Sequence, residues 1–248
     1  MSYIFYIAGN SPASRAAGHA LLQSEFKISP LPWADVTHLL LPVPSFDDQG
    51  NIRGVGTLDG ILDQLPRDIT IIGGNLKHPR LKNYTCIDLL KDPVYLAENA
   101  SITAYCALRL AMMELPCTLK ECPILITGWG RISQCLAFLL RSTGAVVTVA
   151  ARKEENIAIA SALGFHTTAI NNLQPQDFRV IFNTAPAPNL IDADSCAKDC
   201  LKIDLASVKG INGKHVIWAR GLPGKDAPET TGQLIAQRIM HFIQEDTV

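Results

Sequence analysis

The segment of residues 124–133, ILITGWGRIS, constrains the fold more than any other part of the chain. Its first residues predict a buried strand, Gly128 and Gly130 predict a tight turn, and the apolar residues that follow at helical spacing predict a helix. A second apolar segment begins after Gly144. This strand–turn–helix–strand order leaves bare backbone in the turn and unpaired N–H groups at the helix N-terminus, which is the arrangement that binds the pyrophosphate of a dinucleotide.

The glycine pattern of this turn departs from Gly-x-Gly-x-x-Gly at its third position, where the chain has Ser133. Serine is small enough for the close packing of helix against strand that the third glycine serves. The surrounding strands and helix make the pattern a stronger signal than the glycines alone. We predict that the cofactor-binding turn consists of Gly128, Trp129, Gly130, Arg131 and Ile132, with Ser133 as the packing residue. The alternative is a tight turn without a ligand.

The end of the second strand indicates which dinucleotide is bound. An NAD site usually has an acidic residue here, which binds the ribose 2′-hydroxyl. This chain instead has Ala151 followed by Arg152 and Lys153. A guanidinium binds a 2′-phosphate with two hydrogen bonds, whereas a carboxylate would repel it. We therefore predict NADP as the cofactor, with these three residues in contact with it. The alternative is that the two cations are solvated charges at a strand end.

The composition argues against several classes of function. The 248 residues are 48% hydrophobic, enough for one large or two modest domains. The net charge is −1 and no basic run occurs, so we expect no binding to nucleic acid or membranes. We also expect no membrane span and no signal peptide. The seven cysteines form no C-x-x-C pair, which predicts reduced thiols, no metal site and a cytoplasmic protein.

Strand-like and helix-like segments alternate along both halves of the chain. In the first half, strands are predicted at residues 3–8, 38–43 and 69–72, with a fourth strand or edge at 84–89. In the second half, they are predicted near residues 124–127, 146–151, 166–170, 180–184, 202–206 and 215–219. A long helix over residues 99–113 connects the halves, and a final helix over about 230–244 has an apolar face that we expect to pack back on the first half.

These elements predict an α/β fold with two doubly wound parallel-sheet domains joined by a long helix. We expect residues 1–96, together with a helix within 227–248, to form the substrate-side domain. Residues 97–226 are then expected to form the NADP-binding domain.

The loops after the predicted strands supply further candidates, because ligands of open parallel sheets bind at the carboxyl ends of the strands. The cofactor-binding candidates there are Thr184, Ala185, Pro186, Asp204 and Ala206. Asp204 is predicted either to orient a loop beside the cofactor or to cap a turn. For a substrate carboxylate the candidates are Lys225 and Ser11, which lies at a helix N-terminus and has a simple N-cap role as the alternative.

Five segments carry a resemblance to a known family. They are GWGRIS (128–133), VTVAAR (147–152), FNTAPA (182–187), IDLAS (203–207) and GLPGKDAPETTGQLIA (221–236). The first occurs in most nucleotide-binding dehydrogenases, whereas the last is much more specific. With these segments the chain resembles the A-type subunit of dipicolinate synthase, strongly over residues 97–240 and only through LLLPVP (39–44) in the first 90 residues.

The resemblance implies a flavodoxin-like substrate domain and a Rossmann nucleotide domain, as in 2-hydroxyacid dehydrogenases. It implies oxidation of dihydrodipicolinate to dipicolinate with NADP during sporulation. It also implies a small dicarboxylate as substrate and, as partner, a flavoprotein-like second subunit. We expect the chain to form a homo-oligomer.

The connecting helix departs from the family, in which it is similar to N-S-I-P-T-A-E-G. Here the segment 99–106 is NASITAYC, which keeps Asn99 and Thr103 but has Tyr105 in place of the glutamate. These three residues are the catalytic candidates, with Tyr105 as a hydrogen-bond donor or a ring that stacks on the substrate. No histidine follows the spacing of hydroxyacid dehydrogenases, so no general base is evident. The alternatives are a non-catalytic NADP-binding protein and a dehydrogenase of another cyclic dicarboxylate.

Overall fold

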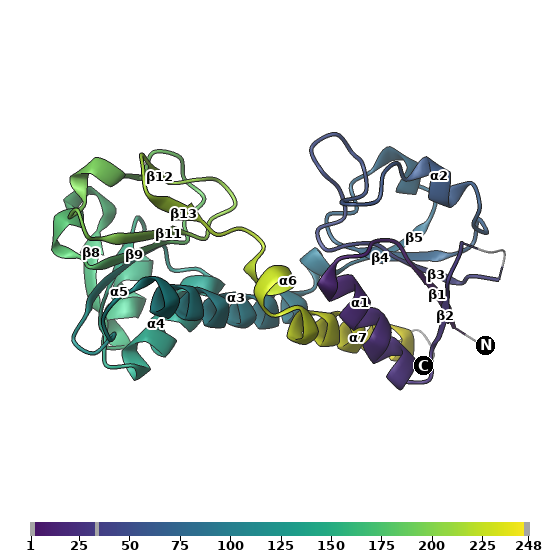
Figure 1. Ribbon diagram of the computed structural model, residues 1–248, viewed down its shortest axis with the longest axis horizontal. Coiled ribbons are helices and arrows are strands. Elements are labelled where there is room, and N and C mark those ends of the chain that lie inside the picture. The colour runs from purple at the N-terminus through teal and green to yellow at the C-terminus, as the bar shows by residue number, and fades with distance from the viewer. Residues whose placement is uncertain (1–2, 33–34, 246–248) are drawn as a thin grey trace. The chain divides into compact units, whose positions relative to one another are not determined.

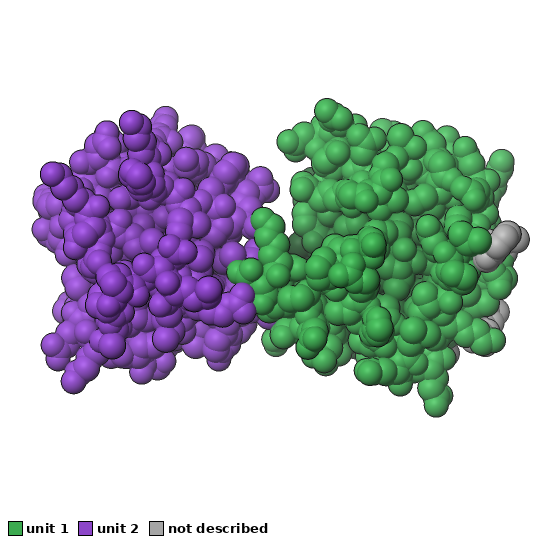
Figure 2. All heavy atoms as spheres, viewed as in Figure 1, with its two compact units in different colours: residues 1–99, 223–248 green, residues 100–222 purple. Residues whose placement is uncertain are grey.

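The computed structural model describes residues 3–32 and 35–245 and has a mixed α/β fold built on two parallel sheets (Figure 1). This confirms the predicted fold class. The chain divides into two compact units, residues 1–99 with 223–248, and residues 100–222 (Figure 2). The unit boundaries lie at 99/100 and 222/223, against domain boundaries at 96/97 and 226/227 expected from the sequence. The substrate and cofactor roles expected for the two domains remain predictions.

The first unit contains a five-stranded sheet whose paired strands are all parallel. The strand order is β2-β1-β3-β4-β5, which is the flavodoxin-like order. The strands are β1 (Ile4–Ile7), β2 (Lys27–Ser29), β3 (His38–Leu40), β4 (Thr70–Gly73) and β5 (Thr85–Asp88). From β1 the chain continues to β2 on one side of the sheet, and from β3 it continues to β4 on the other. The carboxyl ends of β1 and β3 therefore flank the topological switch point.

Two helices of this unit pack against each other, α1 (Pro12–Gln23) and α7 (Pro228–Glu245). The contact is close at Gly232, where an added Cβ would lie 2.5 Å from both the Ala16 Cβ and the Ala17 backbone nitrogen. On the same helix α7, the Arg238 Nε lies 2.5 Å from Asp92 Oδ2 in a largely buried ion pair. The C-terminal helix is therefore an integral part of the first unit.

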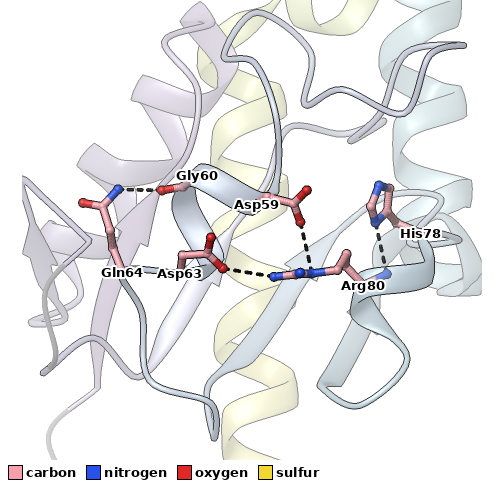
Figure 3. A network of polar contacts seen from close by, with 6 residues as sticks. All are labelled: Asp59, Gly60, Asp63, Gln64, His78 and Arg80. Carbon is pink, nitrogen blue, oxygen red and sulfur yellow. Dashed lines mark hydrogen bonds and ion pairs between the residues drawn. The ribbon is translucent and has the colours of Figure 1, made fainter.

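Short elements of the first unit are held by an exposed polar cluster (Figure 3). The Arg80 guanidinium bridges Asp59 (3.0 Å) and Asp63 (3.1 Å), and so ties α2 (Asp59–Leu62) to the 3-10 helix η1 (Pro79–Leu81). The backbone N–H of Arg80 donates to His78 Nδ1, so this histidine caps η1. A second 3-10 helix, η2 (Leu89–Lys91), precedes the long helix.

The long helix α3 (Pro93–Glu114) begins six residues before the predicted start. Proline is favoured in the first turn of a helix, where its missing N–H has no intrahelical acceptor. The Asp92 carboxylate accepts the N–H of Val94 (2.9 Å) and so closes the helix N-terminus. The boundary between the two units falls within this helix.

The second unit contains a six-stranded sheet in the order β13-β11-β9-β6-β7-β8, again with parallel pairs throughout. Its strands are β6 (Pro123–Thr127), β7 (Val146–Ala151), β8 (His166–Ala169), β9 (Val180–Asn183), β11 (Leu201–Asp204) and β13 (Val216–Trp218). Taken in chain order, they follow the doubly wound Rossmann arrangement, with the switch point between β6 and β9.

The connections of the second unit complete this arrangement. Helices α4 (Arg131–Ser142) and α5 (Glu154–Ala162) join β6 to β7 and β7 to β8. The remaining elements of this unit are the 3-10 helices η3 (Ile170–Asn172), η4 (Pro175–Asp177) and η5 (Ala193–Ser195) and the two-stranded sheet of β10 (Ile191–Asp192) and β12 (Ile211–Asn212). The short helix α6 (Leu222–Asp226) begins at the last residue of the second unit and otherwise belongs to the first. Among the described residues no helix is long and apolar enough to span a membrane, and no group of three or more His, Cys, Asp or Glu side chains could hold a metal.

Candidate functional site

The glycine turn after β6 has a backbone that only glycine adopts readily at its first position. Gly128 has φ +93°, and an added Cβ would lie 2.8 Å from Thr184 Oγ1 and 3.4 Å from the Ala185 nitrogen. Its N–H donates to the Ala150 carbonyl at 2.8 Å, which ties the turn to the neighbouring strand β7. Both the left-handed backbone and the close approach of the loop after β9 therefore require glycine here.

The second glycine of the turn opens the helix N-terminus. Gly130 is the N-cap of α4 and contributes no side-chain cap, and an added Cβ would meet no atom within 4 Å. The first backbone hydrogen bond of α4 runs from Gln134 N to Gly130 O at 3.0 Å, so the N–H groups of residues 131–133 have no intrahelical acceptor. Ser133 is fully buried and its hydroxyl donates to the Gly130 carbonyl at 2.9 Å. The turn thus leaves helix N–H donors beside open space.

A pocket of about 210 Å³ lies at the carboxyl ends of β6, β7, β8 and β9 in the second unit. It is lined by Gly128, Trp129, Ala151, Arg152, Lys153, Asn156, Ile170, Ala185 and Leu190. Six of these residues were predicted from the sequence to bind the cofactor. Asn156, Ile170 and Leu190 were not, because they lie in α5, in η3 and in a loop where no motif marks them. The spacing of Asn156 three residues after Lys153, a predicted cofactor contact, was the one available signal.

Two cations stand at one wall of the pocket. Arg152 and Lys153 follow β7 directly and are both exposed. Lys153 is the N-cap residue of α5, and its side chain makes no capping hydrogen bond. Within the described part of the chain neither side chain is held in an ion pair, so both charges remain available to an anion in the pocket.

Trp129, which lines the pocket, belongs to a cluster of aromatic side chains. The Trp129 side chain is 6% exposed and meets the Phe165 ring edge-to-face with 5.7 Å between centroids. Phe165 in turn contacts Phe138, and the Arg141 guanidinium lies 4.4 Å from the Phe165 centroid. Trp129 Nε1 is buried without a hydrogen-bond partner among the described residues. The indole therefore forms a fixed boundary of the pocket.

Asp204 has the turn-cap role that the sequence left as its alternative. The side chain is fully buried, and its carboxylate accepts the N–H groups of Ala206 (3.1 Å), Gly210 (2.7 Å) and Ile211 (2.9 Å) and the Asn183 amide (2.9 Å). Four donors occupy the carboxylate, which thereby fixes the loop after β11, and its predicted contact with the cofactor stays a prediction. Ala206 is 3% exposed within the same loop, and its predicted contact with the cofactor also stays a prediction.

Polar contacts also join the ends of β6 and β9 at the switch point. Thr127 Oγ1 donates to Asn183 Oδ1 at 2.6 Å, and Thr184 Oγ1 donates to the Thr127 carbonyl at 2.8 Å. The Thr184 hydroxyl therefore holds the two strand ends together. Neither Thr184 nor Pro186 lines the pocket, in contrast to the intervening Ala185.

The substrate candidates of the first unit lie near the α1 N-terminus. The Ser11 hydroxyl caps α1 by accepting the Ser14 N–H at 3.1 Å, which is its predicted alternative role. Lys225 is exposed on α6, where a Cβ added to its neighbour Gly224 would lie 3.8 Å from Ala13 Cβ. The structure thus brings the segment that carries Lys225 to the first turn of the helix that Ser11 caps.

The three catalytic candidates on α3 do not share one face of the helix. At about 100° per residue, Asn99 and Thr103 lie about 40° apart around the helix axis, whereas Tyr105 lies about 160° from Thr103. Thr103 is 7% exposed and Tyr105 is 60% exposed. Tyr105 therefore lies on another face of α3 than Asn99 and Thr103, and the catalytic roles of the three residues remain predictions.

Known proteins share both the sequence pattern and the fold. No family model matches the chain. The A-type subunit of dipicolinate synthase from Bacillus subtilis (strain 168) is 25% identical over 243 residues, covering 88% of this chain and 81% of that protein. The crystal structure of the same subunit type from Bacillus halodurans has a TM-score of 0.81 at 21% identity and covers 97% of each chain. The transhydrogenase from Sinorhizobium meliloti has a TM-score of 0.72 at 14% identity, covering 98% of this chain and 84% of that one. The resemblance to the A-type subunit of dipicolinate synthase is thereby confirmed.

Proposed function

We propose that the chain is an NADP-dependent oxidoreductase that oxidises dihydrodipicolinate to dipicolinate. The observation that carries this proposal is the pocket in which an uncapped glycine turn faces two exposed cations, Arg152 and Lys153. The likeness to the A-type subunit of dipicolinate synthase supports the reaction, and the likeness in fold to a transhydrogenase supports the reaction class.

The pocket residues fit NADP in charge and in shape. Open space beside Gly130 and the N–H donors of α4 suit a pyrophosphate. Among the described residues that line the pocket none is acidic, so no carboxylate opposes a 2′-phosphate. The Arg152 guanidinium provides a planar pair of donors for that group. An NAD site with an acidic residue at this strand end would have the reverse charge.

The reaction requires that a hydride leave the dihydropyridine ring and that a proton be lost. A bound nicotinamide supplies the hydride acceptor. The product gains aromaticity, so the chain's own residues mainly orient the substrate and complement its two carboxylates. We assign carboxylate binding to Lys225 and to the α1 N-terminus at Ser11, with Asn99 and Thr103 as further substrate contacts.

A second candidate function is a nucleotide-binding protein without substrate chemistry. It is favoured by Tyr105, which replaces a glutamate of the family pattern. This tyrosine is exposed and lies on another face of α3 than the buried Thr103. In either case the partner that we propose is a flavoprotein-like second subunit, in keeping with a relative that is named as one part of a larger enzyme. We also propose a homo-oligomeric state and a cytoplasmic location. A different cyclic dicarboxylate as substrate remains the third alternative.

The two candidates are separated by a steady-state assay with dihydrodipicolinate and NADP, run with and without the flavoprotein-like partner. The first candidate predicts NADPH formation, and it predicts that Lys225→Ala raises the KM for the dicarboxylate without changing the Kd for NADP. Lys82→Ala is the matched control, because Lys82 is also an exposed cation but is distant from Lys225 in the sequence. It should change neither the KM for the dicarboxylate nor the Kd for NADP. Tight NADP binding without turnover under both conditions would establish the second candidate instead.

A further inference from the structure

Asn156 occupies a position in the pocket that no motif assigns. It lies in the first turn of α5, three residues after Lys153, so the two side chains lie on the same side of the helix. Both line the pocket together with Arg152. Asn156 is half-buried, and its amide has no hydrogen-bond partner among the described residues. A partly desolvated amide without a partner at the pocket wall is available to a ligand.

The neighbours of this amide define what it can recognise. Its Nδ2 offers two donors and its Oδ1 one acceptor, without net charge. Two cations stand beside it, whereas Glu154 and Glu155 in the same helical turn are exposed and do not line the pocket. A phosphate monoester held between a guanidinium and an ammonium has oxygens left to accept further hydrogen bonds, which the amide can provide.

From this arrangement we infer that Asn156 is a specificity-determining residue for the dinucleotide. Its amide donates to the 2′-phosphate, and its lack of charge leaves Arg152 and Lys153 unpaired until that phosphate arrives. A carboxylate at the same position would pair with these cations within the protein and would accept hydrogen bonds from ribose hydroxyls, which is how NAD is recognised. This inference rests on the proposed function and extends it to a residue of α5.

The test is the near-isosteric variant Asn156→Asp, with NADP and NAD affinities measured by calorimetry. We expect NADP binding to weaken by about tenfold or more, because one donor is lost and one repulsive charge is gained, while NAD affinity stays equal or rises. Asn156→Ala should weaken NADP by about fivefold and leave NAD unchanged. Glu155→Gln is the matched control, one position away and outside the pocket, and should alter neither affinity. An acidic side chain in a first helical turn is favourable, so the Asp variant should keep its thermal unfolding temperature.

The outcomes separate the inference from the proposed function. Wild-type protein that prefers NADP while Asn156→Asp keeps the same preference overturns the inference alone. Equal loss of NADP and NAD affinity in the folded variant overturns it as well. Wild-type protein that binds neither dinucleotide overturns the proposed function and the inference together. A further readout uses adenosine 2′-monophosphate and 5′-monophosphate as probes, and only the 2′-ester should lose affinity in the variant.

Discussion

The first turns of the two units differ in what their helix N-termini offer, although both follow the first strand of a parallel sheet. In the first unit Gly9 leads to a helix whose first residue, Pro12, has no N–H, and Ser11 accepts the N–H of Ser14. In the second unit Gly128 leads to a helix capped by Gly130, which has no side chain to satisfy the N–H groups.

This difference shows that topology alone does not select the dinucleotide site. A helix N-terminus binds phosphate when its N–H groups lack partners and the backbone can be approached closely. The α1 N-terminus keeps fewer free N–H groups, because Pro12 has none and Ser11 accepts that of Ser14, and a Cβ added at Gly9 would lie 3.0 Å from the Pro42 side chain. The α4 N-terminus faces open space at Gly130. This difference supports the proposal that the dinucleotide binds to the second unit and the substrate to the first.

The largest expected effect concerns the packing that completes the first unit. Ending the chain after Glu229 removes most of α7, including the buried Leu234, Ile235 and Ile239. Lost burial of its apolar side chains should lower the free energy of unfolding by about 6 kcal/mol or more. Thermal unfolding of the truncated protein measures this loss. An unchanged unfolding temperature would refute the packing of α7 as a structural element of this unit.

The next effect tests whether the second unit selects NADP over NAD through Arg152. Arg152→Asp should weaken NADP binding by about a hundredfold, about 2.7 kcal/mol, because a bidentate charged contact is replaced by repulsion. NAD binding should change by less than about threefold, since that cofactor lacks the phosphate. Titration of both cofactors checks this, with Lys82→Asp as a charge-matched control in the first unit. An equal loss for the two cofactors would contradict the proposed role of Arg152.

A pair of variants at the glycine turn separates fold from binding. Gly128→Ala should destabilise the protein by about 2 kcal/mol, because alanine is strained at φ +93° and its Cβ would lie 2.8 Å from Thr184 Oγ1. Gly130→Ala should lower stability by about 1 kcal/mol or less, because its Cβ meets open space and the remaining cost is that of alanine at an N-cap, but it should weaken NADP binding. Chemical denaturation and titration measure the two quantities. Equal stabilities for the two variants would contradict the proposal that Gly128 is needed for the fold and Gly130 for binding.

The smallest effect tests the closed helix of the first unit. Ser11→Ala removes the cap of α1 and should cost about 1 kcal/mol of stability. It should not alter the affinity for NADP, because the dinucleotide is assigned to α4. Denaturant unfolding and cofactor titration on the same protein check both points. A changed NADP affinity with an unchanged fold would place part of the dinucleotide site in the first unit.

Much of this fold was predictable because buried parallel strands are continuous apolar runs. Residues 124–127, 146–151 and 180–184 were identified on that basis and correspond to β6, β7 and β9. The short, half-exposed strand β2 has no such run and was missed. The start of α3 at Pro93 was also missed, because it depends on the capping carboxylate of Asp92.

The site residues that lie in one contiguous motif were predictable from the sequence. Those that the fold brings together from distant segments were not. The turn at Gly128 and the cations after β7 lie in contiguous motifs. The contribution of Leu190 to the pocket depends on the path of a loop after β9, which no local pattern specifies. The role of Asp204 depended on donors from Gly210 and Ile211, and their positions follow from the fold of that loop.

Isothermal titration calorimetry of the full chain with NADP, NADPH and NAD is the most direct test of the proposed dinucleotide site. We expect saturable binding of both phosphorylated forms at one site per chain, with NADP bound more tightly than NAD. No heat of binding with any of the three dinucleotides would contradict it.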